Sequence, residues 1–79
     1  MKVLDASALL AFFLKEPGAE AVKAALEEGA VCGAANYSEF AQKTLRGGRD
    51  WPSARVLLDA YHLQIEPVTR EDAEWAARR

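Results

Sequence analysis

Two acidic residues, Asp5 and Glu39, each follow a short apolar run at the point where a helical pattern begins. Asp5 comes directly after MKVL, and Glu39 follows AVCGAA within the step NYSEF. If the two runs are parallel strands, their carboxyl ends meet at one edge of the sheet, where open α/β folds bind ligands. The sequence therefore predicts that two carboxylates far apart in the chain become neighbours.

Paired carboxylates suit a hard cation such as Mg²⁺, which prefers oxygen ligands and is commonly held by one or two carboxylates plus a substrate phosphate. Such an ion supports phosphodiester hydrolysis, because it activates water and stabilises charge on phosphate oxygens. No basic residue stands beside Asp5 or Glu39 in the sequence, so their mutual repulsion also favours a cation. Ser7 adds a hydroxyl that could orient Asp5 or a metal-bound water.

The same residues also fit a structural role at helix N-termini. Asp is a favoured N-cap that contributes about 0.5–2 kcal/mol, and Asp5 immediately precedes a helical pattern. Asn36 and Glu39 have the spacing of a capping box, and Ser7 fits a second cap. Spacing alone does not separate a cap from a ligand, and an acid in the first helical turn can act as both.

The elements that would position these residues alternate between short apolar strands and amphipathic helices. We expect strands at 1–4, 30–35 and 63–68, and helices at 6–16, 19–28, 36–46, 51–61 and from Thr69 onward. The third helix should bury Tyr37, Phe40, Ala41 and Leu45, and the fourth should bury Val56, Leu57, Ala60 and Tyr61. This alternation predicts an α/β domain with a mainly parallel sheet.

Other reactive or aromatic residues receive simpler interpretations. Cys32 is the single cysteine and lies in an apolar stretch, so we expect a small buried hydrophobe. His62 stands between a helix and a strand, which favours a surface position over a general-base role. Packing is favoured over base stacking for four aromatic residues, Tyr37, Trp51, Tyr61 and Trp75.

Length and charge limit the classes of function. The 79 residues suffice for one small domain, and the formal net charge of −2 argues against a strong grip on nucleic acid by the whole chain. Residues 43–55 nevertheless hold four Lys and Arg residues against one acid, a patch for RNA phosphates, an acidic protein segment or solvent. The longest apolar run is far shorter than the roughly 20 residues of a membrane span, so we expect a cytoplasmic protein without membrane contact.

The stretch VLDASALLAFFLKEPGAEAV, followed by AANYSEF, resembles the start of PIN-domain proteins of the VapC type, the ribonuclease toxins of toxin–antitoxin pairs. The resemblance rests on the order of the D-x-S step, the Leu/Phe-rich helix, EPG and the N-x-x-E step, and it continues as a weaker pattern to Arg79. It implies a Mg²⁺- or Mn²⁺-dependent endoribonuclease. Asp5 and Glu39 match the first two acids of the family, and Ser7 matches a supporting hydroxyl.

The resemblance also implies a PIN-like three-layer α/β/α fold, truncated after about the third strand and fifth helix, so that residues 1–79 form a single incomplete domain. The remaining family acids come from a later segment, and the strand at 1–4 would be left at an open edge. The implied partners are RNA, a cognate antitoxin and a second copy in a homodimer. Two alternatives are an inactive remnant that binds an antitoxin or dimerises, and an unrelated α/β domain with capped helices.

Overall fold

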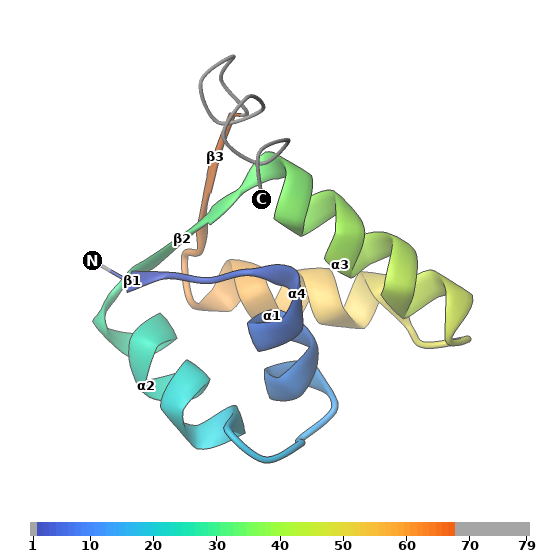
Figure 1. Cartoon of the computed structure of the whole chain (residues 1–79), viewed down its shortest axis with the longest axis horizontal. Coiled ribbons are helices and arrows are strands. Elements are labelled where there is room, and N and C mark those ends of the chain that lie inside the picture. The colour runs from blue at the N-terminus through green and yellow to red at the C-terminus, as the bar shows by residue number, and fades with distance from the viewer. Residues whose placement is uncertain (1, 68–79) are drawn as a thin grey trace, which may run out of the picture.

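The computed structural model describes residues 2–67, in which short strands alternate with helices (Figure 1). Most element ends follow local signals, such as the Pro17-Gly18 pair before the second helix and Gly29 after it. The elements are β1 (Lys2–Val3), α1 (Ala6–Phe13), α2 (Ala19–Glu28), β2 (Ala30–Gly33), α3 (Ala34–Arg46), α4 (Trp51–Ala60) and β3 (Gln64–Glu66).

The three strands form one parallel sheet in the order β1-β2-β3, as the alternating pattern predicts. Val3 pairs with Val31, and Cys32 pairs with Ile65. Beyond β1, the Leu4 amide still donates to the Val31 carbonyl at 2.8 Å. The parallel register brings the carboxyl ends of β1 and β2 to the same edge, where α1 and α3 begin (Figure 1).

In the described residues, the helices cover one face of this sheet. Each crossover moves one strand further in the same direction, and right-handed crossovers then place both helix pairs on the same side. The burial pattern agrees, because Ala30 and Cys32 of β2 are buried whereas Val3 of β1 is 76% exposed on the opposite face. The third layer of the predicted α/β/α fold is not among residues 2–67, and the predicted helix from Thr69 lies outside them.

The core lies between this covered face and the helices. Phe40 of α3 is fully buried at its centre and packs edge-to-face against Phe13 and Trp51, with ring centroids 6.3 and 5.6 Å apart. The buried apolar residues are Leu4, Ala6, Leu9, Ala25, Leu26, Ala30, Cys32, Phe40, Ala54 and Leu58. Each strand and helix that borders the predicted site is therefore anchored by at least one buried side chain, apart from the exposed pair that forms β1.

The predicted buried face of α4 is wrong. The helix buries Ala54 and Leu58, whereas Val56 is 68% exposed and Leu57 is 38% exposed. Apolar residues occur on both sides of α4, so periodicity alone does not select a face. The small side chain of Ala54 allows close approach to the core, and the contact of Trp51 with Phe40 fixes the start of the helix.

The predicted inner face of α3 is wrong at one position, and several predicted boundaries shift, including the end of α1, which lies at Phe13 and not at residue 16. Leu45 is 59% exposed, and Thr44 is buried instead, because its hydroxyl is satisfied by the Phe40 carbonyl at 2.8 Å. β2 ends at Gly33, and α3 begins at Ala34, two residues before the predicted start. Among residues 2–67, we find no helix with the length and apolar character needed to cross a membrane.

Candidate metal centre

Asp5 ends the first strand segment and caps α1. Its backbone is extended, and its Oδ1 accepts a hydrogen bond from the Ala8 amide at 2.8 Å. The side chain is exposed, and among residues 2–67 no group donates to Oδ2. The cap therefore uses one carboxylate oxygen and leaves the second oxygen facing solvent, so a cap and a metal ligand are compatible roles for the same residue.

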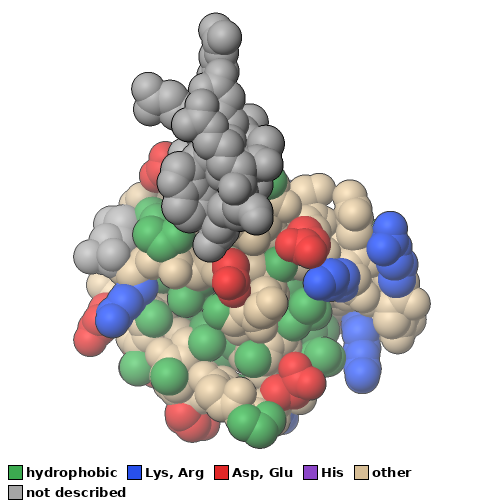
Figure 2. All heavy atoms as spheres, in the orientation of Figure 1, with side chains coloured by type: hydrophobic (Ala, Val, Ile, Leu, Met, Phe, Trp, Pro, Cys, Tyr) green, Lys and Arg blue, Asp and Glu red, His purple; other side chains and the backbone are tan. Residues whose placement is uncertain are grey.

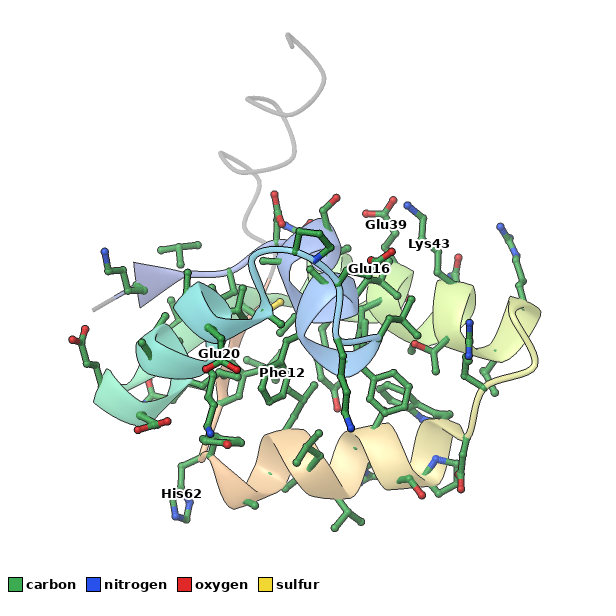
Figure 3. The ribbon with its side chains drawn as sticks, turned by 90° about the horizontal axis from the view of Figure 1, so that it is seen from below. Phe12, Glu16, Glu20, Glu39, Lys43 and His62 are labelled. Atoms are coloured by element: carbon green, nitrogen blue, oxygen red, sulfur yellow. The ribbon has the colours of Figure 1, made fainter. Side chains whose placement is uncertain are left out.

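Glu39 lies in the second turn of α3 and not in the first as predicted, because the helix begins at Ala34, two residues before Asn36. The N-cap is Gly33 and receives no side-chain hydrogen bond, so the predicted capping box of Asn36 and Glu39 is wrong. The Glu39 carboxylate is exposed and lies 3.2 Å from the ammonium group of Lys43, one helical turn away (Figure 3). The charge of Glu39 therefore has a cationic partner four residues further along the chain, although no basic residue is adjacent to it in sequence.

The Glu39–Lys43 pair is weak enough to be exchanged. Both side chains are about half exposed, and exposed pairs at this spacing contribute about 0.3–0.5 kcal/mol. A divalent ion at Glu39 would therefore displace Lys43 at little free-energy cost. The ion pair neutralises the charge of Glu39, and the carboxylate stays accessible to other ligands.

Asn36 links the two turns that carry the acids. Its Oδ1 accepts a hydrogen bond from the Ala6 amide at 3.3 Å, across 30 residues of sequence. Ala6 directly follows Asp5, and Asn36 lies one helical turn before Glu39, so this bond joins the start of α1 to the start of α3. Sequence reasoning assigned Asn36 to a cap; its spacing to Glu39 on one face of α3 was the signal for a role at the site.

Ser7 and His62 differ in their relation to this edge. Ser7 is exposed as the second residue of α1, two positions from Asp5, and its hydroxyl makes no hydrogen bond with residues 2–67. His62 is exposed beyond the end of α4, on the other side of the molecule from Glu39 (Figure 3). The surface position predicted for His62 is confirmed.

Cys32 is fully buried, so the predicted role of a small core hydrophobe is confirmed. Burial, and secondarily the negative charge of Asp5, raises the pKa of the Cys32 thiol from 9.0 to about 11. The thiol is therefore protonated at neutral pH, which excludes a thiolate nucleophile. The influence of Asp5 on Cys32 also reflects how the ends of β1 and β2 lie together.

The aromatic residues within the described range pack against one another, as predicted. Tyr37 contacts Trp51 with ring centroids 5.6 Å apart, and Tyr61 contacts Phe12 at 5.7 Å. Burial, and secondarily the charge of Asp59, raises the pKa of Tyr37 above its ordinary value. Trp75 lies outside the described residues.

The carboxylate groups of Asp5 and Glu39 are the type of ligand that a hard divalent ion prefers. Two exposed carboxylates, Asp5 and Glu39, follow neighbouring parallel strands, and carboxylate oxygens are the ligands that Mg²⁺ prefers. Residues 2–67 contain no group of three or more His, Cys, Asp or Glu side chains that could hold an ion. Two carboxylates match the number with which Mg²⁺ is commonly held when substrate phosphate supplies further oxygens.

The fold and this edge define a parallel α/β domain with acidic side chains where its strands end. A family model described as PIN domain matches residues 2–79, and the chain therefore belongs to the PIN domain family. PIN domains are generally nucleases and typically use divalent metal ions. A comparison with curated proteins finds no match.

Proposed function

We propose that this protein is a Mg²⁺- or Mn²⁺-dependent endoribonuclease of the VapC toxin type, controlled by a cognate antitoxin. The observation that carries the proposal is the exposed carboxylate of Asp5 at the end of β1, joined to α3 through the Ala6–Asn36 hydrogen bond. Membership of the PIN domain family supports the nuclease class, and the D-x-S and N-x-x-E steps support the toxin type.

In this proposal Asp5 and Glu39 hold the ion, which when bound supplies charge stabilisation at the scissile phosphate and acidifies a water molecule. The cap bond from Ala8 to Oδ1 fixes the Asp5 carboxylate, so Oδ2 is oriented before the ion arrives. Ser7 places a hydroxyl beside Asp5, where it orients the carboxylate or a water. Lys43 neutralises Glu39 until an ion replaces it.

The proposal is tested by Mg²⁺-dependent cleavage of single-stranded RNA. Asp5→Asn and Glu39→Gln keep the side-chain shape and remove the charge, so each should lower the cleavage rate by about 100-fold. Glu20→Gln is the matched control, because Glu20 is an exposed acid on α2, and it should cleave at the wild-type rate. Wild-type cleavage by both Asp5→Asn and Glu39→Gln would show that the site is wrongly assigned.

A second candidate function is an inactive module that binds an antitoxin or forms a homodimer. It is favoured by an open groove of about 560 Å³ lined by Phe12, Phe13, Pro17, Leu57 and Tyr61, with charged residues at its rim. Figure 3 shows Phe12 between α1 and α4, with Glu16 and Glu20 on the segments that follow α1. Exposed Val56 extends the apolar surface along α4.

Association measurements separate this candidate from the nuclease. If the groove is an interface, sedimentation should show a dimer or an antitoxin complex, and Leu57→Asp should weaken it by placing a charge in the groove. Ala24→Asp, at an exposed residue of α2 outside the groove lining, adds the same charge and serves as the control. A monomer that binds no antitoxin at high concentration would contradict the module.

A further inference from the structure

One face of α3 carries a polar stripe that leads away from the sheet edge. Asn36, Glu39, Lys43 and Arg46 follow one another at helical spacings of three, four and three residues, which places them on a common face. Ten residues of helix rise by about 15 Å. The stripe thus begins at the Asn36–Ala6 contact, passes the acid Glu39 and ends in cations.

The cations continue beyond the end of α3. We define the basic patch as Lys43, Arg46, Arg49 and Arg55, which stand in residues 43–55 with the single acid Asp50. Figure 2 shows Lys and Arg side chains gathered over the C-terminal end of α3, whereas acidic side chains are spread over the rest of this face. The patch concentrates positive charge in a chain whose formal net charge is −2.

Helix electrostatics explain only part of the patch. Lys43 and Arg46 lie in the last turn of α3, where cations stabilise the negative end of the helix dipole. Arg49 lies just before α4, where the positive end of the dipole disfavours cations, and Arg55 lies in the second turn of α4, where the dipole gives a cation no support. The positions of Arg49 and Arg55 therefore favour an anionic partner outside the helices.

The acid within the patch forms no ion pair with these arginines, although it remains charged. Both oxygens of Asp50 are engaged as the α4 cap, because Oδ1 accepts from the Ser53 amide at 3.2 Å and Oδ2 from its hydroxyl at 2.7 Å. Those hydrogen bonds lower the pKa of Asp50. Among residues 2–67, the Glu39–Lys43 pair is the ion pair present, so the three arginines of the patch have no acidic partner in that range.

The turn between α3 and α4 holds the patch in a defined shape. The Gly47 amide donates to the Lys43 carbonyl at 3.0 Å, and the Arg49 amide donates to the Thr44 carbonyl at 3.0 Å. Thr44 is itself buried and bonded to Phe40 at 2.8 Å. The backbone beneath the cations is therefore tied to the core, which lowers the entropy lost when they bind a ligand.

We propose that the basic patch binds the phosphate backbone of single-stranded RNA beside the phosphodiester bond held at Asp5 and Glu39. The inference that the bound RNA runs toward Asp5 and Glu39 rests on the proposed function. The inference that the patch binds RNA rests on the charges of the patch alone. Lys43 and Arg46 of the patch lie on the same face of α3 as Glu39, so an RNA strand bound to the patch can extend along this face toward Glu39 and Asp5. When an ion replaces Lys43 at Glu39, the Lys43 ammonium becomes available to a phosphate.

RNA is favoured over an acidic protein segment by the composition of the stripe. Protein interfaces have an apolar centre, but all four stripe residues, Asn36, Glu39, Lys43 and Arg46, are polar. The apolar groove that a protein would use is lined by α1, the segment after it, the start of α2 and α4. Phosphates spaced along a strand match cations spaced along a helix and the turn that follows it.

The test uses fluorescence anisotropy of a labelled single-stranded RNA with the whole chain in EDTA, so that no cleavage occurs. Arg46→Glu/Arg49→Glu should weaken binding by about tenfold or more and reduce the slope of log affinity against log salt by about 1.4. Lys15→Glu/Lys23→Glu makes the same charge change at two exposed residues of the groove rim and should leave the slope unchanged. Arg46→Lys/Arg49→Lys should bind as the wild type does.

Three outcomes would overturn the inference. The first is equal weakening by the two glutamate double variants with unchanged circular dichroism, and the second is wild-type binding by Arg46→Glu/Arg49→Glu. The third is patch-dependent binding of polyglutamate without binding of RNA. Patch-dependent RNA binding without any Mg²⁺-dependent cleavage would support the patch and reject the proposed function, so the two claims fail separately.

Discussion

At the residue scale, Asp5 combines two roles because a carboxylate has two oxygens. Oδ1 caps α1 through the Ala8 amide, and Oδ2 stays available to a cation. Sequence reasoning found both roles and left them as alternatives, since spacing does not separate them. The structure confirms the cap and shows no donor to Oδ2 among residues 2–67, so the two roles are compatible and mutation can test them separately.

Asp5→Ala should lower the free energy of unfolding by about 1 kcal/mol, because alanine cannot cap α1. Asp5→Asn should stay close to the wild-type stability, because asparagine is an equally good cap. Both variants should lose Mg²⁺-dependent RNA cleavage, since neither carries the charge. Urea unfolding and a cleavage assay measure the two effects, and equal destabilisation by both variants would contradict the cap.

Cys32 makes stability depend on alkaline pH. Its pKa is raised from 9.0 to about 11 in the folded chain, so above pH 9 the unfolded chain releases the thiol proton while the folded chain keeps it. The corresponding stability is complete below pH 9 and is lost as pH rises toward 11. Cys32→Ala should therefore lose less stability over this interval than the wild type.

This alkaline effect is measured by urea unfolding from pH 7 to pH 11. Some loss should remain in Cys32→Ala, because the pKa of Tyr37 is raised as well, chiefly by burial. Stability curves with the same pH dependence in both proteins would show that Cys32 ionises as easily in the folded chain as in the unfolded one.

At the element scale, the sequence predicts ends better than faces. α2 spans Ala19–Glu28 as expected, and α4 begins after Asp50 with Pro52 in its first turn, because Gly, Pro and Asp act locally. The buried face of α4 was mispredicted because it depends on which neighbour the helix meets. Tertiary packing selects Ala54 and Leu58 from apolar residues on both sides.

In the candidate site, too, the features set by local sequence were predicted, whereas contacts made by side chains were not. Asp5 and Glu39 were predicted at one sheet edge from the strand-to-helix order alone. The parallel pairing of β1 with β2 places the starts of α1 and α3 at that edge, and Glu39 lies in the second turn of α3. The bond from Ala6 to Asn36 and the pair of Glu39 with Lys43 were missed. The first is a tertiary bond across 30 residues, which depends on how α1 packs beside α3. The second is a pair of residues one helical turn apart, which was missed because only the residues adjacent to Glu39 in sequence were considered.

Leu58→Ala tests the buried face of α4. Leu58 is 2% exposed, so its truncation should lower the free energy of unfolding by about 2–5 kcal/mol. Val56→Ala removes apolar volume from the solvent-facing side and should change stability by about 0.5 kcal/mol or less. Denaturant unfolding of both variants compares them, and a larger loss for Val56→Ala would contradict the orientation of α4.

Asn36→Ala tests the link between α1 and α3. Loss of the bond to the Ala6 amide should lower the free energy of unfolding by about 0.5–1.5 kcal/mol and reduce RNA cleavage, because the two acid-bearing turns are no longer joined. Gln42→Ala is the control on the same helix, where the side chain bonds only the exposed Ser38 at 3.4 Å. Equal cleavage by the two variants would contradict a positioning role for Asn36.

At the scale of the whole molecule, charge is distributed unevenly, and the two faces of the sheet differ in how far they are covered. Although the formal net charge is −2, a basic patch lies at the end of α3, on the same helix as the acid Glu39. Within residues 2–67 the sheet is covered on one face, and Val3 is exposed on the other. The edge that carries Asp5, the basic patch and the apolar groove therefore occupy separate places among residues 2–67, as the proposals of an ion, RNA and a protein partner require.

We propose above that Asp5 and Glu39 hold one divalent ion between α1 and α3. Paramagnetic broadening by Mn²⁺ in the amide spectrum of the ¹⁵N-labelled chain tests it most directly, because broadening depends on distance from the ion. The account predicts that signals of residues 5–8 and 36–40 broaden first, and that Asp5→Asn abolishes this effect. Broadening that is strongest at the adjacent acids Glu27 and Glu28 of α2, or that is unchanged in Asp5→Asn, would contradict it.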